Sequence, residues 1–132
     1  MPVEDLRKNE MMAHLLAALS EGKDIGHYGR LVFAMVARHF LSREELLAWL
    51  GKNPGFPEQE ARALVHQVEE KDYSPPTRER ILEWQAHQSF PICPNPKDPD
   101  AGNVYKDLHF PERVYDHITE YHEQKTELES KS

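Results

Sequence analysis

Apolar residues recur at intervals of three and four along most of the chain, which is the spacing of amphipathic α-helices. The first such segment runs from about Glu4 to Leu19, and the second from about Gly26 to Phe40. The second segment is the most apolar of the chain, so we expect it to lie at the centre of the fold. No stretch shows a convincing alternation of apolar and polar residues typical of a half-buried strand.

Capping residues and prolines predict where the later helices begin. Ser42–Glu45 fits a capping box, so a third helix is expected to start at Ser42 and to stop at Gly51. Pro57 stands where a fourth helix can start, because its missing N–H costs nothing in a first turn. A fifth helix is expected over Thr77–His87 and a last one from about Pro111.

Between the last two predicted helices lies a segment in which four prolines leave no room for a regular element. These are Pro91, Pro94, Pro96 and Pro99. The pattern therefore predicts an all-α fold, a compact single-domain bundle of about six helices with a Pro-rich irregular loop. The length of 132 residues fits one domain. We expect residues 1–124 to form this helical domain and residues 125–132 a charged, frayed tail.

The formal net charge of −7 argues against a duplex-DNA binder with an extended basic face. It predicts weak non-specific affinity for nucleic acid, although a small local cationic pocket remains compatible with it. The first residues lack the basic and apolar regions of a signal peptide. The longest apolar-rich stretch, residues 31–41, is too short to span a bilayer. We therefore expect a cytoplasmic location and no membrane partner.

Catalytic and metal-binding motifs are missing from the sequence, so we expect no enzymatic activity. The single cysteine, Cys93, excludes an internal disulfide and a CxxC zinc site, and without a neighbouring base it is expected to be a structural thiol. Among the eight histidines, His117 and His122 are five apart, which is not the spacing of paired helical ligands. Asp98 and Asp100 are better explained as parts of a solvated loop than as a cation site.

The start of the second predicted helix brings together three side chains of chemical interest. Gly26–Arg30 places an imidazole, a phenol and a guanidinium in about one turn, where backbone N–H groups favour an anion. Arg30 can bind a phosphate with two hydrogen bonds, and His27 lies three residues away on a shared face. Two interpretations stay open. In the first, the start of this helix holds one phosphate group or one nucleotide. In the second, Arg30 pairs with Asp24 or another acid, and His27 only caps the helix.

Four short motifs follow one another along the chain: HYGRL at 27–31, LSREELLAW at 41–49, YSPPT at 73–77 and ICPN at 92–95. Their order and spacing resemble the C-terminal domain of the primase large subunit. In that family an H-x-G-R element opens the central helix. The third motif is similar to the family's Y-T-P-P-S-C, and the fourth is similar to its L-C-P-N. The resemblance covers most of the chain, from about Met11 to Leu108.

The family's domain usually holds a four-iron, four-sulfur cluster on four cysteines. Matched residue by residue, the vestigial cluster positions fall near Met11, at Arg78, at Cys93 and near Ala101 or the following glycine. Only the third is still a cysteine, and such a cluster needs its thiolates, so we expect no iron–sulfur cluster and no other cofactor. Cluster-free relatives of this domain exist as noncatalytic third subunits of primases, and related helical modules occur in primase-polymerases.

The resemblance implies a noncatalytic accessory domain or subunit in DNA replication. It would bind single-stranded template DNA and the 5′-triphosphate of the initiating nucleoside triphosphate beside a catalytic primase or primase-polymerase partner. His27 and Arg30 match the triphosphate-contacting positions. Tyr28 is a stacking candidate, and Arg78 a further candidate for contact with the template. Trp84 is expected to belong to the core.

Two other functions stay open. The acidic charge favours a protein-interaction module of a replication or defence complex that has lost the nucleotide site. A small metal-dependent hydrolase, with ligands from separate helices, is the third alternative.

Overall fold

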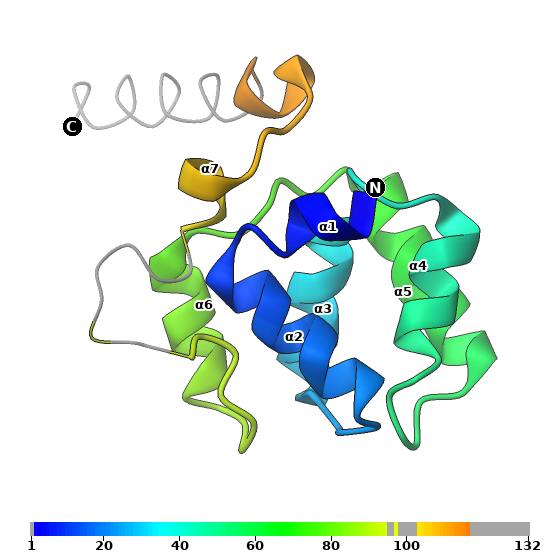
Figure 1. The fold of residues 1–132 in the computed structure, drawn as a ribbon. Coiled ribbons are helices and arrows are strands. Elements are labelled where there is room, and N and C mark those ends of the chain that lie inside the picture. Colours follow the sequence, from blue (N-terminus) through cyan, green and yellow to red (C-terminus); the bar gives the residue numbers. More distant parts are fainter. Residues whose placement is uncertain (1, 95–96, 98–102, 117–132) are drawn as a thin grey trace, which may run out of the picture.

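The computed structural model describes residues 2–94, 97 and 103–116, and every regular element in that part of the chain is a helix (Figure 1). The prediction of a compact all-α fold is confirmed. A short helical segment over residues 112–116 follows the last labelled helix. The labelled helices are α1 (Pro2–Leu6), α2 (Glu10–Ser20), α3 (Gly26–Ala37), α4 (Arg43–Leu50), α5 (Glu58–Glu70), α6 (Arg78–Gln85) and α7 (Val104–Asp107).

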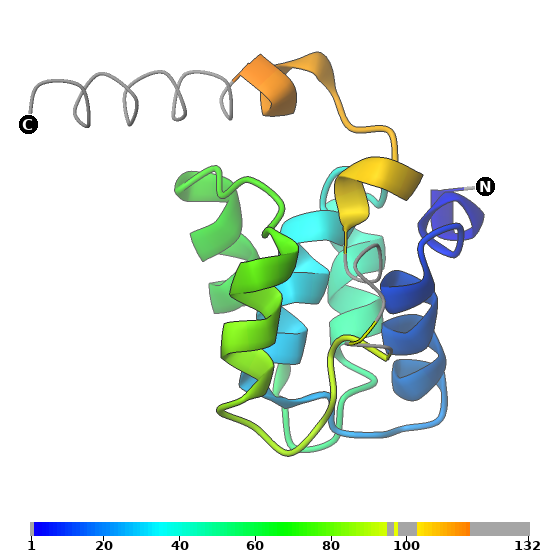
Figure 2. The same ribbon diagram turned by 90° about the vertical axis from the view of Figure 1, so that its left-hand side faces the viewer.

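Helix α3 lies in the middle of the bundle and packs against α2, α4, α5 and α6 (Figures 1 and 2). All six residues from 32 to 37 are buried, and the Phe33 side chain is fully enclosed. Burial of this apolar surface favours folding. The expectation that the second predicted helix is central is therefore confirmed. At one end of the bundle α1 lies close to the segment that follows α7.

The prediction of one helix over Glu4–Leu19 is wrong, because Asn9 divides it into α1 and α2. The Asn9 side chain is the N-cap of α2, and its Oδ1 accepts a hydrogen bond from the Met12 N–H at 3.0 Å. Asn9 is buried, and its Nδ2 also donates to Asp107 at 3.1 Å. Asparagine is among the preferred N-cap residues because its side chain satisfies a free N–H of the first turn.

The predicted starts of the third, fourth and fifth helices agree with the structure. Ser42 and Glu45 form the capping box, each accepting a hydrogen bond from the backbone N–H of the other. Pro57 directly precedes α5, and the Thr77 hydroxyl caps α6 by accepting from Arg80 N–H at 3.3 Å. The starts of α4 and α6 depend on local hydrogen bonds, which is why a short stretch of sequence predicts them, whereas Pro57 makes no side-chain cap bond at α5.

Two predicted helices end earlier than expected, and one helix was not predicted. Helix α3 ends at Ala37 rather than Phe40, because residues 38–40 continue in tighter turns. Helix α6 ends at Gln85 rather than His87. The short helix α7 begins after Asn103, whose side chain accepts from the Tyr105 N–H at 3.2 Å.

The last predicted helix begins as expected, since residues 112–116 are helical. Its continuation, the predicted tail at 125–132 and most of the Pro-rich loop beyond residue 94 lie outside the described residues. Within the described ranges, no helix has both the length and the apolar character needed to cross a membrane.

Arg38, just after α3, binds the connection between α5 and α6, and Asp72 in that connection also binds the segment 112–116. The Arg38 Nη2 donates to Asp72 Oδ1 at 2.6 Å and to the Tyr73 carbonyl at 3.0 Å, in the connection between α5 and α6. Asp72 also accepts from Arg113 at 3.2 Å, in the segment 112–116. Only 8% of the Arg38 side chain is exposed. Hydrogen bonds made by a charged group that is this poorly hydrated contribute more than those of a fully exposed pair, although Asp72 itself is 48% exposed.

Candidate functional site

The first turn of α3 already has acceptors for two of its backbone N–H groups. Gly26 N–H donates to Asp24 Oδ1, and Tyr28 N–H donates to Gln88 Oε1, both at 2.9 Å. These two side chains, and not His27, therefore satisfy the start of the helix. Gly26 has a φ of +81°, and a Cβ there would lie 2.5 Å from Gln88 Oε1. The backbone conformation favours glycine at this position, and a Cβ here would displace the Gln88 amide from its hydrogen bonds.

Gln88 connects the start of α3 to the segment that follows α6. Its Nε2 donates to the carbonyls of Ile25 and Phe90, both at 2.9 Å, while its Oε1 accepts from Tyr28. One amide thus satisfies three backbone groups, of which the Tyr28 N–H belongs to the first turn of α3. The sequence did not point to Gln88, because its two partners at the start of α3, Ile25 and Tyr28, lie about sixty positions away along the chain.

Arg30 forms the ion pair with Asp24 that one of the two interpretations anticipated. The guanidinium Nη1 lies 3.1 Å from Asp24 Oδ1, and its central carbon lies 4.4 Å from the centre of the Phe56 ring. The Arg30 side chain is 17% exposed, whereas that of Asp24 is 61% exposed. The Gly26 N–H, together with Asn53 and Arg30, holds the pKa of Asp24 below its usual value. The carboxylate therefore stays ionised and paired at neutral pH.

On another side of the same turn, four aromatic rings form what we call the aromatic platform. Tyr28 and Trp84 are stacked, with ring centres 5.8 Å apart and planes 14° apart. His27 contacts Tyr28 edge-on at 5.1 Å, and His87 lies 6.5 Å from it. The Arg80 guanidinium lies 6.0 Å from the centre of the Trp84 ring.

The aromatic platform is partly open to solvent. Tyr28 and Trp84 are half-buried, while His27, His87 and Arg80 are exposed. Trp84, expected to belong to the core, packs against the core through only part of its surface. The platform thus combines stacked aromatic faces with an exposed cation, which is what a nucleobase and its phosphate contact in single-strand binding proteins.

The predicted nucleotide-binding residues fall into two groups in the structure. Residues two positions apart project from different sides of a helix. Tyr28 therefore faces Trp84 on α6. Arg30 instead faces Phe56, in the connection between α4 and α5, and Asp24, in the connection between α2 and α3. His27 contacts Tyr28 and so belongs to the platform.

The vestigial cluster positions are distributed between the core and the surface. Met11 and Cys93 are buried in the same hydrophobic core, and the Cys93 N–H donates to Gln85 Oε1 at 2.8 Å. Arg78 is the first residue of α6 and is half-buried. Ala101 lies outside the described residues.

A metal-dependent hydrolase, the third alternative, would need several metal ligands from separate helices. The described residues contain no group of three or more His, Cys, Asp or Glu side chains arranged to hold a metal ion. His117, His122, Asp98 and Asp100 lie outside the described ranges.

Comparison of the chain with protein-family models, with curated proteins and with solved structures finds no match. The residues of this chain and their arrangement at the start of α3 are therefore what bear on its function.

Proposed function

We propose that this chain is a noncatalytic accessory domain of a primase or primase-polymerase, which binds single-stranded template DNA and the 5′-triphosphate of an initiating nucleotide. The observation that carries the proposal is the aromatic platform. Stacking on aromatic rings accepts any base, because every base has an aromatic face. A template must be held without strong sequence preference, and this platform provides such contacts without a catalytic group.

Arg30 supplies the second part of the proposal, the contact with a triphosphate. Its partner Asp24 is mostly exposed, and exposed ion pairs contribute little to stability. A triphosphate carries more charge than a carboxylate and presents oxygens that a guanidinium can bind with two hydrogen bonds. We infer that the triphosphate replaces Asp24 at Arg30, while His27 and the platform contact the nucleotide from the adjacent side of the turn.

The partner in this proposal supplies the chemistry. Joining two nucleotides requires both to be held together, and positioning alone lowers that barrier substantially. The accessory domain would act in the cytoplasm, without a cofactor of its own, with Arg78 as a further contact to the template. The net charge of −7 predicts that the domain alone binds single strands weakly and that most affinity comes from stacking.

The proposal is tested by titrating fluorescein-labelled oligothymidylate with the protein and following fluorescence anisotropy. Loss of base stacking costs about 1–3 kcal/mol per base, so Tyr28→Leu should weaken binding about 5- to 150-fold. Leucine preserves most of the apolar packing at this position. The matched control is Trp49→Phe, which changes an aromatic residue on α4 away from the platform and should leave affinity unchanged.

A second arm of the same titration tests Arg30. An oligonucleotide with a 5′-triphosphate should bind more tightly than its 5′-hydroxyl twin, and Arg30→Ala should remove that difference. Asp24→Asn should increase it, because the amide still accepts from Gly26 but no longer competes as a charge. Equal affinity for both oligonucleotides in all three proteins would contradict the triphosphate role.

The protein-interaction module remains a second candidate, and one observation favours it. At the start of α3, Asp24 and Gln88 already occupy two N–H groups and the guanidinium. A relative that had lost its nucleotide site would fill the start of this helix in this way. Absence of any platform-dependent binding to oligothymidylate would favour this candidate.

A further inference from the structure

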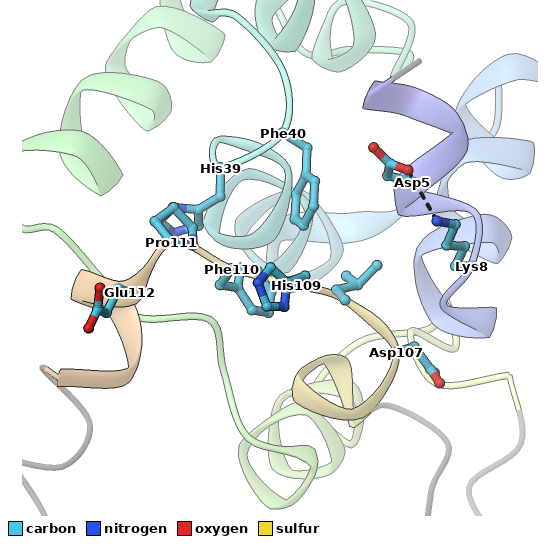
Figure 3. Close-up of a pocket in the computed structure, with 10 residues that line it drawn as sticks. Asp5, Lys8, His39, Phe40, Asp107, His109, Phe110, Pro111 and Glu112 are labelled. Atoms are coloured by element: carbon cyan, nitrogen blue, oxygen red, sulfur yellow. Dashed lines mark ion pairs between the residues drawn. The ribbon is translucent and has the colours of Figure 1, made fainter.

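A cleft of about 660 Å³ opens at the C-terminal end of α3, at the other end of this helix from the aromatic platform (Figure 3). Side chains from α1 and the turn after it, from the turn after α3, and from the end of α7 and the segment after it line the cleft. This volume lies within the range of ligand-binding pockets and exceeds that of a single side chain.

The floor of the cleft is apolar and aromatic. Phe40 is half-buried, and its ring contacts the ring of Phe110 with centres 5.5 Å apart. Leu108 and Pro111 continue this surface. Aromatic and aliphatic groups at this floor can cover the hydrocarbon part of a ligand.

The rim of the cleft is acidic. Figure 3 shows Glu112 on one side and Asp5 and Asp107 on the other. The one lysine of the rim, Lys8, is paired with Asp5 at 3.3 Å. Among the aspartate, glutamate and lysine side chains that line the cleft, three carboxylates against one ammonium leave two negative charges in excess; His39 and His109 line it as well.

His39 adds no compensating positive charge to the cleft. Burial, and then the neighbouring Arg38 and Arg113, lower the pKa of His39 to about 4, against the opposing effect of Asp72. The imidazole is therefore neutral at pH 7 and adds no positive charge to the lining of the cleft. A nucleic acid is disfavoured here for the same reason, since its phosphates would meet carboxylates.

We propose that this cleft binds an arginine side chain of a partner protein together with its apolar neighbours in sequence. A guanidinium stacks on an aromatic face such as that of Phe40 and binds a carboxylate with two parallel hydrogen bonds. Glu112 is exposed and offers that carboxylate, while Asp107 is already held by Asn9. This inference is independent of the nucleotide-binding proposal, because the two surfaces lie at opposite ends of α3.

The test is an NMR titration of the ¹⁵N-labelled protein with the peptide acetyl-Leu-Arg-Leu-amide. Saturable shifts are expected for the amides of residues 39–40, 107–110 and 112. The matched peptide carries citrulline, which has the same shape as arginine without its charge, and should bind at least tenfold more weakly. Equal binding of the two peptides, or shifts spread over α5 instead of the cleft, would overturn the inference.

Charge reversal at the rim gives an independent readout. Glu112→Lys should weaken binding of the arginine peptide at least fivefold, since it replaces the offered carboxylate by a like charge. Glu60→Lys, at an exposed position of α5, makes the same change in net charge away from the cleft and should leave affinity unchanged. Equal effects of the two variants would show that only overall charge matters and would overturn the proposal. Affinity unchanged by Glu112→Lys would do the same.

Discussion

Arg30 and Arg38 lie near opposite ends of α3, and each pairs with an aspartate, yet their surroundings differ. Arg38 is 8% exposed and binds both Asp72 and a backbone carbonyl. Arg30 is 17% exposed, stacks on Phe56, and binds one aspartate that is itself mostly open to solvent. The two arginines therefore differ in the exposure of their side chains and in the number of groups that they bind.

The two ion pairs differ in the free energy that their separation would cost. If Arg38 lost Asp72, a poorly hydrated guanidinium would remain without its charged partner, which is costly. If Arg30 lost Asp24, water or a phosphate could take the place of the carboxylate at little cost. This contrast is why we assign ligand exchange to Arg30 and a structural role to Arg38.

The largest effect is expected for Arg38→Ala. The variant loses two hydrogen bonds that involve charged groups, and the free energy of unfolding should fall by about 2–3 kcal/mol. Urea unfolding followed by circular dichroism measures it. The control is Arg113→Ala, whose side chain is 60% exposed and which should cost under about 1 kcal/mol. Similar losses for both variants would remove the structural side of the comparison.

An intermediate effect is expected from pH at His39, which directly follows Arg38. The pKa of His39 is lowered from 6.5 to about 4 in the folded protein. Between these values the unfolded chain binds a proton that the folded protein excludes, so stability falls as the pH decreases from about 6.5 to 4. Above pH 6.5 the residue is neutral in both states and contributes no dependence.

The size of this effect should be about 1–2 kcal/mol, because solvent screens part of the shift at a half-buried ring. Urea unfolding at pH 7 and pH 5 should show a smaller loss for His39→Gln than for the original chain. An identical pH dependence in both proteins would mean that other groups cause it.

The smallest effect on stability is expected for Arg30→Ala. Loss of an exposed ion pair and of a contact with Phe56 should cost about 1 kcal/mol or less. The same variant should abolish the preference for a 5′-triphosphate in the oligonucleotide titration. A loss of stability as large as that of Arg38→Ala would show that Arg30 is a structural residue and that the comparison fails.

The sequence predicted those features of the fold whose interacting residues lie close together along the chain. The starts of α4 and α6 were predicted because their caps lie within three residues. The break at Asn9 was missed, although the residue is a good N-cap, because the apolar spacing continues through it. Its second partner, Asp107, is 98 positions away.

The same limit applies to the site. Local spacing singled out the turn that holds His27, Tyr28 and Arg30 and left open the pair with Asp24, while the nucleotide-binding roles came from the family resemblance. Local spacing could not predict that Trp84 contacts Tyr28 or that Gln88 accepts from the first turn of α3. Both contacts arise only when α6 packs against α3.

The most direct measurement of the central claim uses the fluorescence of the two tryptophans. In Trp49→Phe only Trp84, on the aromatic platform, remains to report, whereas in Trp84→Phe only Trp49 remains. We expect oligothymidylate to quench Trp84 saturably, because a base stacks on the platform, and to leave Trp49 unchanged. Quenching of Trp49 alone, equal quenching of both, or no quenching of Trp84 would contradict the account.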